Sequence, residues 1–198
     1  MSTSTQPRLV LLQFVSVSID KLLEETANHP YEGPTTVFHA RHLPAITVSA
    51  YIARIFRYAP CSAECFITAL VYIRRILESK GMNFLQGATV HRLIISAVLL
   101  SSKYLDDIYY NNSFYAKIGG ISPKEMNALE VEMLTFLNYD LSVSPVEYER
   151  LSSLLFSQET DDNETLSNVW FPKSKPDEEP FAGSPDASFV PTARAACC

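Results

Sequence analysis

The stretch Thr89–Asp107 reads TVHRLIISAVLLSSKYLDD, and its middle, Leu93–Leu100, is apolar on every side of a helix apart from one serine. A helix of this kind belongs inside a protein, enclosed by other helices. At about 19 residues it would be ~28 Å long, which favours a helix over a buried strand. Its polar ends do not suit a bilayer-spanning segment. The stretch therefore predicts a buried central helix.

The end of this predicted helix is unusual, because Lys103, Tyr104, Asp106 and Asp107 follow the apolar run at once. Aspartate near a helix C-terminus opposes the helix dipole, which prefers cations there. Local rules are most often broken at functional sites, so the pattern points to a function at this end.

Working outward, apolar spacing and cap residues predict six further helices. Their expected ranges are 8–27, 47–58, 63–80, 112–118, 123–137 and 145–157. In the first range the alternation of Val15–Ile19 would also suit a strand.

Start and stop signals support most of these ranges. Ser62 and Thr89 are expected as N-caps, and Gly81 as the residue that ends a helix. The runs Ser122–Glu125 and Ser144–Glu147 each read as a capping box followed by proline at the first helical position.

The predicted fold class is all-α, with one domain over residues 8–157. Residues 1–7 are polar and are expected to be disordered. Residues 158–198 contain five prolines, and eight Asp/Glu against three Lys/Arg give them a net charge of −5. Their apolar residues are scattered, so an acidic disordered tail is predicted.

Composition argues against several classes of function. The net charge is −6 and no Lys/Arg-rich block stands out, which argues against nucleic acid as a partner. Glycine-rich phosphate loops are missing, and His39 and His42 stand in a proline-bounded loop without acidic or cysteine neighbours. No set of nucleophile, base and orienting residue can be assembled from the chain. We expect neither an enzyme nor a cofactor or metal.

The remaining signals concern the compartment. The apolar run Leu9–Ile19 is followed by charged residues without a cleavage site, so it does not read as a signal peptide. Cys61 and Cys65 do not form a metal or disulfide framework. A terminal Cys197-Cys198 is an ending that some small GTPases use for prenylation, but an acidic tail suits anionic membranes poorly. We expect a nuclear or cytoplasmic protein without a membrane partner.

Several segments together resemble the cyclin family, most closely the P-type (U-type) cyclins of plants and the phosphate-pathway cyclins of fungi. The resemblance covers roughly residues 8–157 and implies a cyclin box, a five-helix bundle around a buried central helix, with its core at about 47–141 and flanking N- and C-terminal helices. It is carried by Tyr51–Tyr58 (YIARIFRY), Cys61-Ser62, Val90–Leu93 (VHRL), Ser102–Ser122 (SKYLDDIYYNNSFYAKIGGIS), Lys124–Asn127 (KEMN) and Leu129-Glu130.

The resemblance implies a regulatory subunit that binds and activates a cyclin-dependent kinase. In cyclins a lysine at the end of the central helix and a glutamate on the fifth helix contact the kinase beside its mobile helix, and Lys103 and Glu130 match them. It also implies apolar kinase contacts from Tyr104, Leu134, Tyr139 and Leu141.

Each assignment has a plainer alternative. Lys103 and Glu130 could form a surface salt bridge worth under about 1 kcal/mol. Asp106 and Asp107 could neutralise kinase arginines in place of a phosphothreonine. Alternatively, they could cap a helix end or lie on the solvated surface. Four aromatic residues could contact a partner or pack around a short helix, namely Tyr109, Tyr110, Phe114 and Tyr115. The whole chain could instead be a non-kinase helical adaptor, such as a transcription-related scaffold.

Two departures from the family pattern qualify the resemblance. The usual Tyr-Leu-Asp-Arg run reads Tyr72-Ile73-Arg74-Arg75, so an internal ion pair that uses that aspartate is not expected. The segment Ile46–Ile52 (ITVSAYI) lacks the Met-Arg-Ala-Ile-Leu patch with which mitotic cyclins hold substrate motifs, and docking of that kind is in doubt.

Overall fold

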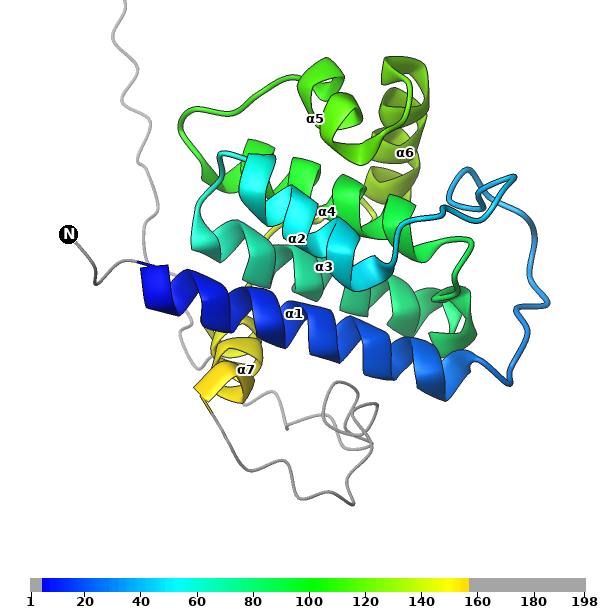
Figure 1. The fold of residues 1–198 in the computed structure, drawn as a ribbon, viewed down its shortest axis with the longest axis horizontal. Coiled ribbons are helices and arrows are strands. Elements are labelled where there is room, and N and C mark those ends of the chain that lie inside the picture. Colours follow the sequence, from blue (N-terminus) through cyan, green and yellow to red (C-terminus); the bar gives the residue numbers. More distant parts are fainter. Residues whose placement is uncertain (1–4, 157–198) are drawn as a thin grey trace, which may run out of the picture.

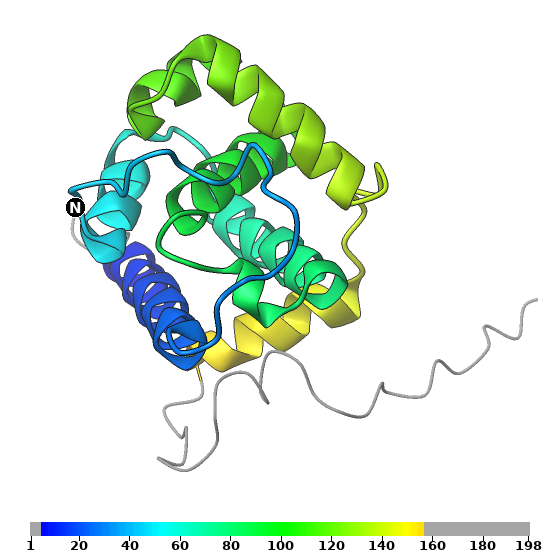
Figure 2. The same cartoon turned by 90° about the vertical axis from the view of Figure 1, so that its right-hand side faces the viewer.

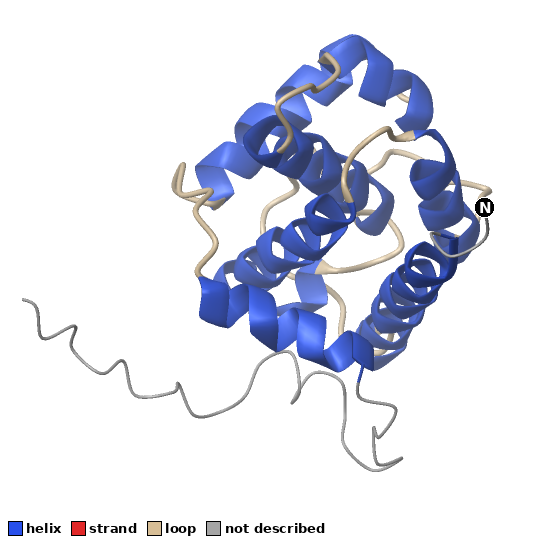
Figure 3. Ribbon diagram, turned by 90° about the vertical axis from the view of Figure 1, so that its left-hand side faces the viewer, coloured by secondary structure: helices blue, strands red, loops and turns tan. Residues whose placement is uncertain are grey.

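The computed structural model describes residues 5–156 of the 198-residue chain, and within them it contains α-helices, one short 3-10 helix and no strand (Figures 1 and 3). The predicted all-α class is confirmed. The predictions for residues 158–198, Cys197-Cys198 included, lie outside the described residues. The helices are α1 (Thr5–Thr26), α2 (Val48–Tyr58), α3 (Ala63–Lys80), η1 (Met82–Phe84), α4 (Val90–Leu105), α5 (Asn112–Gly119), α6 (Pro123–Phe136) and α7 (Pro145–Phe156).

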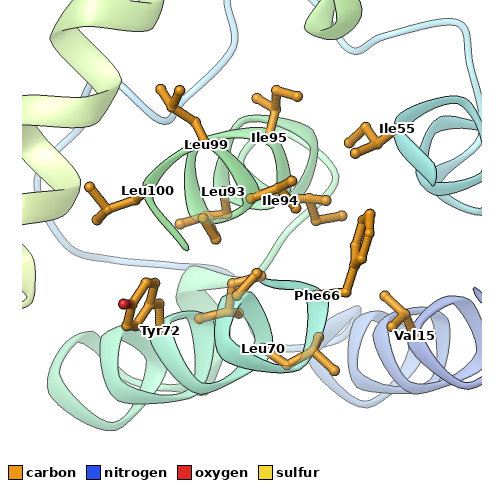
Figure 4. Packing of buried hydrophobic residues seen from close by; sticks show 14 of the residues in the cluster. Val15, Ile55, Phe66, Leu70, Tyr72, Leu93, Ile94, Ile95, Leu99 and Leu100 are labelled. Atoms are coloured by element: carbon orange, nitrogen blue, oxygen red, sulfur yellow. The ribbon is translucent and has the colours of Figure 1, made fainter. Parts of the chain in front are cut away.

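The predicted central helix is α4, and it contacts α2, α3, α5 and α6. Twelve of its sixteen residues are buried. Figure 4 shows Ile95 and Leu99 pointing to one side of α4 and Ile94 to another, toward side chains from neighbouring helices. Each fully buried aliphatic side chain contributes about 1.5–3 kcal/mol, so α4 organises the core (Figure 2).

Two buried serines of α4, Ser96 and Ser101, satisfy their hydroxyl groups inside their own helix. Ser96 Oγ donates to the Arg92 carbonyl at 2.7 Å, and Ser101 Oγ donates to the Val98 carbonyl at 3.1 Å. Hydrogen bonds back to the preceding turn are the usual way for a helix to bury a serine. Both positions stay small enough for neighbouring helices to approach.

Two predicted N-caps are wrong in their side-chain role. Ser62 stands before α3 but makes no capping hydrogen bond, and its Oγ lies 3.2 Å from Cys65 Sγ. Thr89 Oγ1 donates to the Phe84 carbonyl at 2.6 Å instead of capping α4. In both cases another short-range contact takes up the side-chain oxygen in place of the cap.

Both predicted capping boxes are confirmed. Glu125 N donates to Ser122 Oγ at 3.2 Å and Ser122 N donates to Glu125 Oε2 at 3.0 Å; Ser144 and Glu147 repeat the pair at 3.2 and 3.1 Å. Between α5 and α6, Gly120 adopts the left-handed conformation with φ of 70°, which glycine tolerates without strain.

The first helix differs from its prediction at its start. α1 begins at Thr5, three residues before the predicted start, and proline at position 7 falls in its first turn, where no donor is needed. Leu9 is 58% exposed. The buried face runs through Leu11, Val15, Ile19 and Leu22 at helical spacing, so the strand alternative for Val15–Ile19 is wrong.

Ion pairs and hydrogen bonds between charged side chains connect α7 to α3. Arg75 donates two hydrogen bonds from Nη2 to the carboxylate of Glu147, at 2.9 and 2.8 Å, and one from Nε at 3.1 Å. Arg74, in the position of the usual family aspartate, lies 3.2 Å from Glu78 and 3.9 Å from Glu147. Burial raises the pKa of Glu147, but hydrogen bonds from Arg75 and Ser144 outweigh it and hold that pKa below its ordinary value.

We expect Arg75→Ala to lower the free energy of unfolding by about 1–2 kcal/mol, since the variant leaves Glu147 half-buried without its guanidinium partner. Because the pKa of Glu147 is lowered in the folded chain, this contribution is present above the unfolded pKa and is lost as pH falls through the folded one. Urea unfolding at neutral and acidic pH measures both effects. Arg57→Ala, an exposed cation on α2, is the control. Equal stability of the two variants would contradict this account.

Candidate kinase-facing site

Lys103 and Glu130 form an ion pair at the C-terminal end of α4. Lys103 Nζ lies 2.6 Å from Glu130 Oε1, and the two side chains are 27% and 16% exposed. The ammonium also donates to Asn112 Oδ1 at 2.6 Å. The pair is therefore shielded on one side and accessible on the other, unlike a freely solvated surface salt bridge.

Asn112 joins three helices at this point, and sequence reasoning missed it. Its Nδ2 donates to Glu130 Oε2 and to Asn127 Oδ1, both at 2.7 Å, while its Oδ1 accepts from Lys103. Asn112 opens α5, and Asn111 caps that helix by accepting from Phe114 N at 3.0 Å. The only local signal was the Asn-Asn pair before a short helix, which reads as a cap and says nothing of α4 or α6.

Large apolar side chains are exposed in the segments that flank the ion pair along the chain. We call these residues the apolar rim. Ile108, five residues after Lys103 in the chain, is 80% exposed, and Tyr139, nine residues after Glu130, is 68% exposed. The rim consists of Tyr104, Leu105, Ile108, Tyr109, Tyr110, Val131 and Tyr139. Exposed apolar side chains grouped around polar ones are typical of a protein-binding surface.

The four predicted apolar contact residues divide into two kinds. Tyr104 and Tyr139 are exposed, at 49% and 68%. Leu134 and Leu141 are half-buried and pack against the core. Tyr139 is also held in a left-handed backbone conformation with φ of 59°, directly after Asn138 at 52°. Two consecutive non-glycine residues in this region cost free energy, which singles out the turn that presents Tyr139.

Asp106 and Asp107, which the sequence treats alike, have different surroundings. Asp106 Oδ2 accepts from Ser62 N at 3.4 Å, from Ser102 Oγ at 3.3 Å and from Cys65 Sγ at 3.4 Å. It therefore places its charge at the N-terminus of α3, where the helix dipole favours an anion. This resolves the conflict with the dipole of α4 and gives Asp106 a structural role. Asp107 is exposed.

We expect Asp106→Ala to lower the free energy of unfolding by about 1–2 kcal/mol, because it leaves the half-buried Ser62 N and Cys65 Sγ at the start of α3 without their acceptor. Asp107→Ala is expected to leave stability unchanged, within about 0.5 kcal/mol. Thermal unfolding of the two variants makes the comparison. Loss of stability in Asp107→Ala, or none in Asp106→Ala, would contradict the assignment.

The four aromatic residues that could either contact a partner or pack around the short helix fall into two groups, buried and exposed. Tyr115 is fully buried and belongs to the core. Phe114 is half-buried and stacks on Tyr110, with ring centroids 4.4 Å apart. Tyr109 and Tyr110 are 55% and 44% exposed, so these two are the ones available to a partner.

The residues considered for metal or thiol chemistry have structural surroundings. His39 Nδ1 accepts from Thr36 N at 3.0 Å. Cys61 and Cys65 are both buried and free. Within residues 5–156, no group of three or more His, Cys, Asp and Glu side chains could hold a metal ion. In the same part of the chain, no helix has the length and apolarity to cross a membrane.

Comparison with known proteins decides the family. A family model described as Cyclin matches residues 16–141, which include α2 to α6 and the Lys103–Glu130 pair. The chain belongs to the cyclin family. Cyclins are regulatory proteins and not catalysts, and the cyclin box predicted from the sequence is the observed bundle around α4.

The similar curated proteins are plant cyclins. The chain is 44% identical to Cyclin-U4-1 of Arabidopsis thaliana over 125 residues, 63% of this chain and 62% of that protein. It is 40% identical to Cyclin-P4-1 of Oryza sativa subsp. japonica over 125 residues, 63% of this cyclin and 59% of that one. The matched part thus spans less than two thirds of these relatives.

Proposed function

We propose that this cyclin is the regulatory subunit that binds and activates a cyclin-dependent protein kinase. The observation that supports it best is the Lys103–Glu130 ion pair, braced by Asn112 and flanked by the apolar rim. A fixed pair of opposite charges sets the register of a partner, and apolar groups around it exclude water.

Both members of the pair retain capacity for a partner. An ammonium has three donors, and Lys103 uses two of them, on Glu130 and Asn112. Each oxygen of Glu130 accepts one hydrogen bond in the free chain, and a carboxylate oxygen has room for another. We assign Lys103 to a backbone carbonyl of the kinase and Glu130 to a backbone N–H, beside the mobile kinase helix.

The apolar rim supplies the binding area. Aromatic side chains dominate interface energetics because they bury a large area at a low cost in conformational entropy, and three of the rim residues that precede α5 are tyrosines. Tyr104, Tyr109 and Tyr110 are therefore assigned to the kinase contact, with Leu134 and Leu141 supporting the surface from below.

Asp107 is the carboxylate that we assign to the kinase activation segment. It is exposed at the end of α4, four residues beyond Lys103, whereas Asp106 is engaged inside the domain. A fixed carboxylate can neutralise the arginines that a phosphothreonine otherwise neutralises. We assign Asp106 to the structural role instead, because its Oδ2 accepts hydrogen bonds inside the domain.

Activation in this account is a shift of the kinase toward its active arrangement, limited by the difference in affinity for the two states. The cyclin contributes no catalytic group. We place the complex in the nucleus or the cytoplasm.

The test is a titration of the purified chain against a panel of cyclin-dependent kinases. We expect saturable one-to-one binding to at least one of them, and a heat capacity change of negative sign, because apolar surface is buried. If no kinase binds while a non-kinase protein co-purifies from the native cells, the chain is a helical adaptor and the proposal is wrong.

A further inference from the structure

The side-chain amide of Asn112 closes a ring of hydrogen bonds around the Lys103–Glu130 pair. Lys103 Nζ donates to Glu130 Oε1 and to Asn112 Oδ1, both at 2.6 Å. Asn112 Nδ2 donates to the other carboxylate oxygen, Glu130 Oε2, at 2.7 Å. Each of the three side chains therefore contacts the other two, and the three come from α4, α5 and α6.

The neighbours of Asn112 fix the orientation of its amide. An ammonium only donates hydrogen bonds and an ionised carboxylate only accepts them. The amide oxygen therefore faces Lys103, and the amide nitrogen faces Glu130. The second N–H of Asn112 Nδ2 donates to Asn127 Oδ1 at 2.7 Å. Asparagine supplies one acceptor group and two donors in one plane, and this site uses all three.

The ring prevents the ion pair from closing on itself. An isolated Lys–Glu pair on a surface can bring its ammonium against both carboxylate oxygens, and such a pair is mobile and contributes little to stability. Here Asn112 occupies Glu130 Oε2, so Lys103 pairs with Oε1 alone. One N–H of the ammonium and one acceptor position on each carboxylate oxygen are left over for another molecule.

A pair held in this way is ordered before a partner arrives. Lysine and glutamate side chains lose rotamer freedom when an interface fixes them, and that loss weakens binding. In this chain Asn112 fixes both side chains when the domain folds. Asn112 is itself the first residue of α5, and the N-cap of that helix, Asn111, accepts from Phe114 N at 3.0 Å. The amide is therefore anchored to a capped helix.

Given the kinase binding proposed above, we propose that Asn112 is a positioning residue of the kinase-facing site and that this role requires the N–H groups of its amide. Asn112 acts through Lys103 and Glu130, which it holds singly paired and aligned for the backbone of the kinase. The carbonyl end of the amide is not sufficient, because an oxygen in place of Nδ2 would repel Glu130 Oε2.

A double-mutant cycle in the free chain tests the contact between the amide and the carboxylate. In the wild-type chain we expect Glu130→Gln to lower the melting temperature by about 2–4 °C, because Lys103 loses its charged partner. In Asn112→Asp the same substitution should raise the melting temperature, because it removes one of two facing carboxylates. Asn111→Asp is the matched control, since it adds the same charge one residue away and keeps a good N-cap. In that background Glu130→Gln should lower the melting temperature, as in the wild type. A fall in the Asn112→Asp background as well overturns the proposal.

Kinase titration tests the positioning role itself, at a temperature where circular dichroism shows every variant to be folded. We expect Asn112→Asp to weaken kinase binding about tenfold and Asn111→Asp to change it less than about twofold. Asn111→Ala removes the cap of α5 and should lower the melting temperature without a loss of affinity.

Equal affinities of Asn112→Asp and Asn111→Asp, or an equal loss in Asn111→Ala, overturn the proposal. In the first case the wild-type chain still binds its kinase, so only the assignment of Asn112 fails. A wild-type chain that binds no kinase is the separate failure of the proposed function.

Discussion

A variant with Lys103→Ala and Glu130→Ala is expected to lose kinase binding by about a hundredfold or more, and so to fail in co-purification. Removing one partner of a desolvated charge pair in an interface costs about 2–5 kcal/mol. Here both partners and their link to Asn112 disappear together. The apolar rim remains, but no charge pair then fixes its alignment with the kinase. Calorimetric titration with the kinase that binds the wild-type chain measures the loss.

The fold of this double variant should survive, because neither charge is left alone in a half-buried site. A thermal melt of the free chain checks that point. Lys124→Ala with Glu64→Ala, two exposed charges of the same signs on α6 and α3, is the matched control. Unchanged kinase affinity in the Lys103/Glu130 variant would remove the pair from the interface.

The second large effect is expected from Ala97→Leu in the middle of α4. Ala97 is fully buried on the helix around which the other helices pack. Three added carbons would overpack the core at a cost of about 1–3 kcal/mol or more. For a chain of this size that corresponds to a fall in melting temperature of roughly 2–4 °C for each kcal/mol.

Ala53→Leu is the control for this variant, because it adds the same atoms to an exposed helical position on α2. We expect its melting temperature to stay close to that of the wild type. If Ala97→Leu melts at the same temperature as Ala53→Leu, α4 is not tightly enclosed on that face.

Much of the fold follows from local signals. The apolar run of α4 and the serine–glutamate pairs before α6 and α7 are contiguous patterns with one physical meaning each, and all three are confirmed. The positions of Lys103 and Glu130 came from the family resemblance. Their contact could not be derived from the residues alone, since the two lie on different helices and are 27 positions apart in the sequence.

Most of what the sequence did not reveal depends on distant contacts. The role of Asn112 requires α4, α5 and α6 to meet, and that of Asp106 requires the end of α4 to lie beside the start of α3. Ser62 and Thr89 are good caps by residue type, but each is drawn into another hydrogen bond.

The most direct test of the central claim is the activity of a cyclin-dependent kinase with and without this cyclin. Phosphate transfer to a peptide substrate should rise by orders of magnitude as the cyclin is added and should saturate at one cyclin per kinase. The Lys103→Ala, Glu130→Ala variant should produce no rise at the same concentrations. Kinases that bind the wild-type chain and show the same activity with and without it would contradict the account.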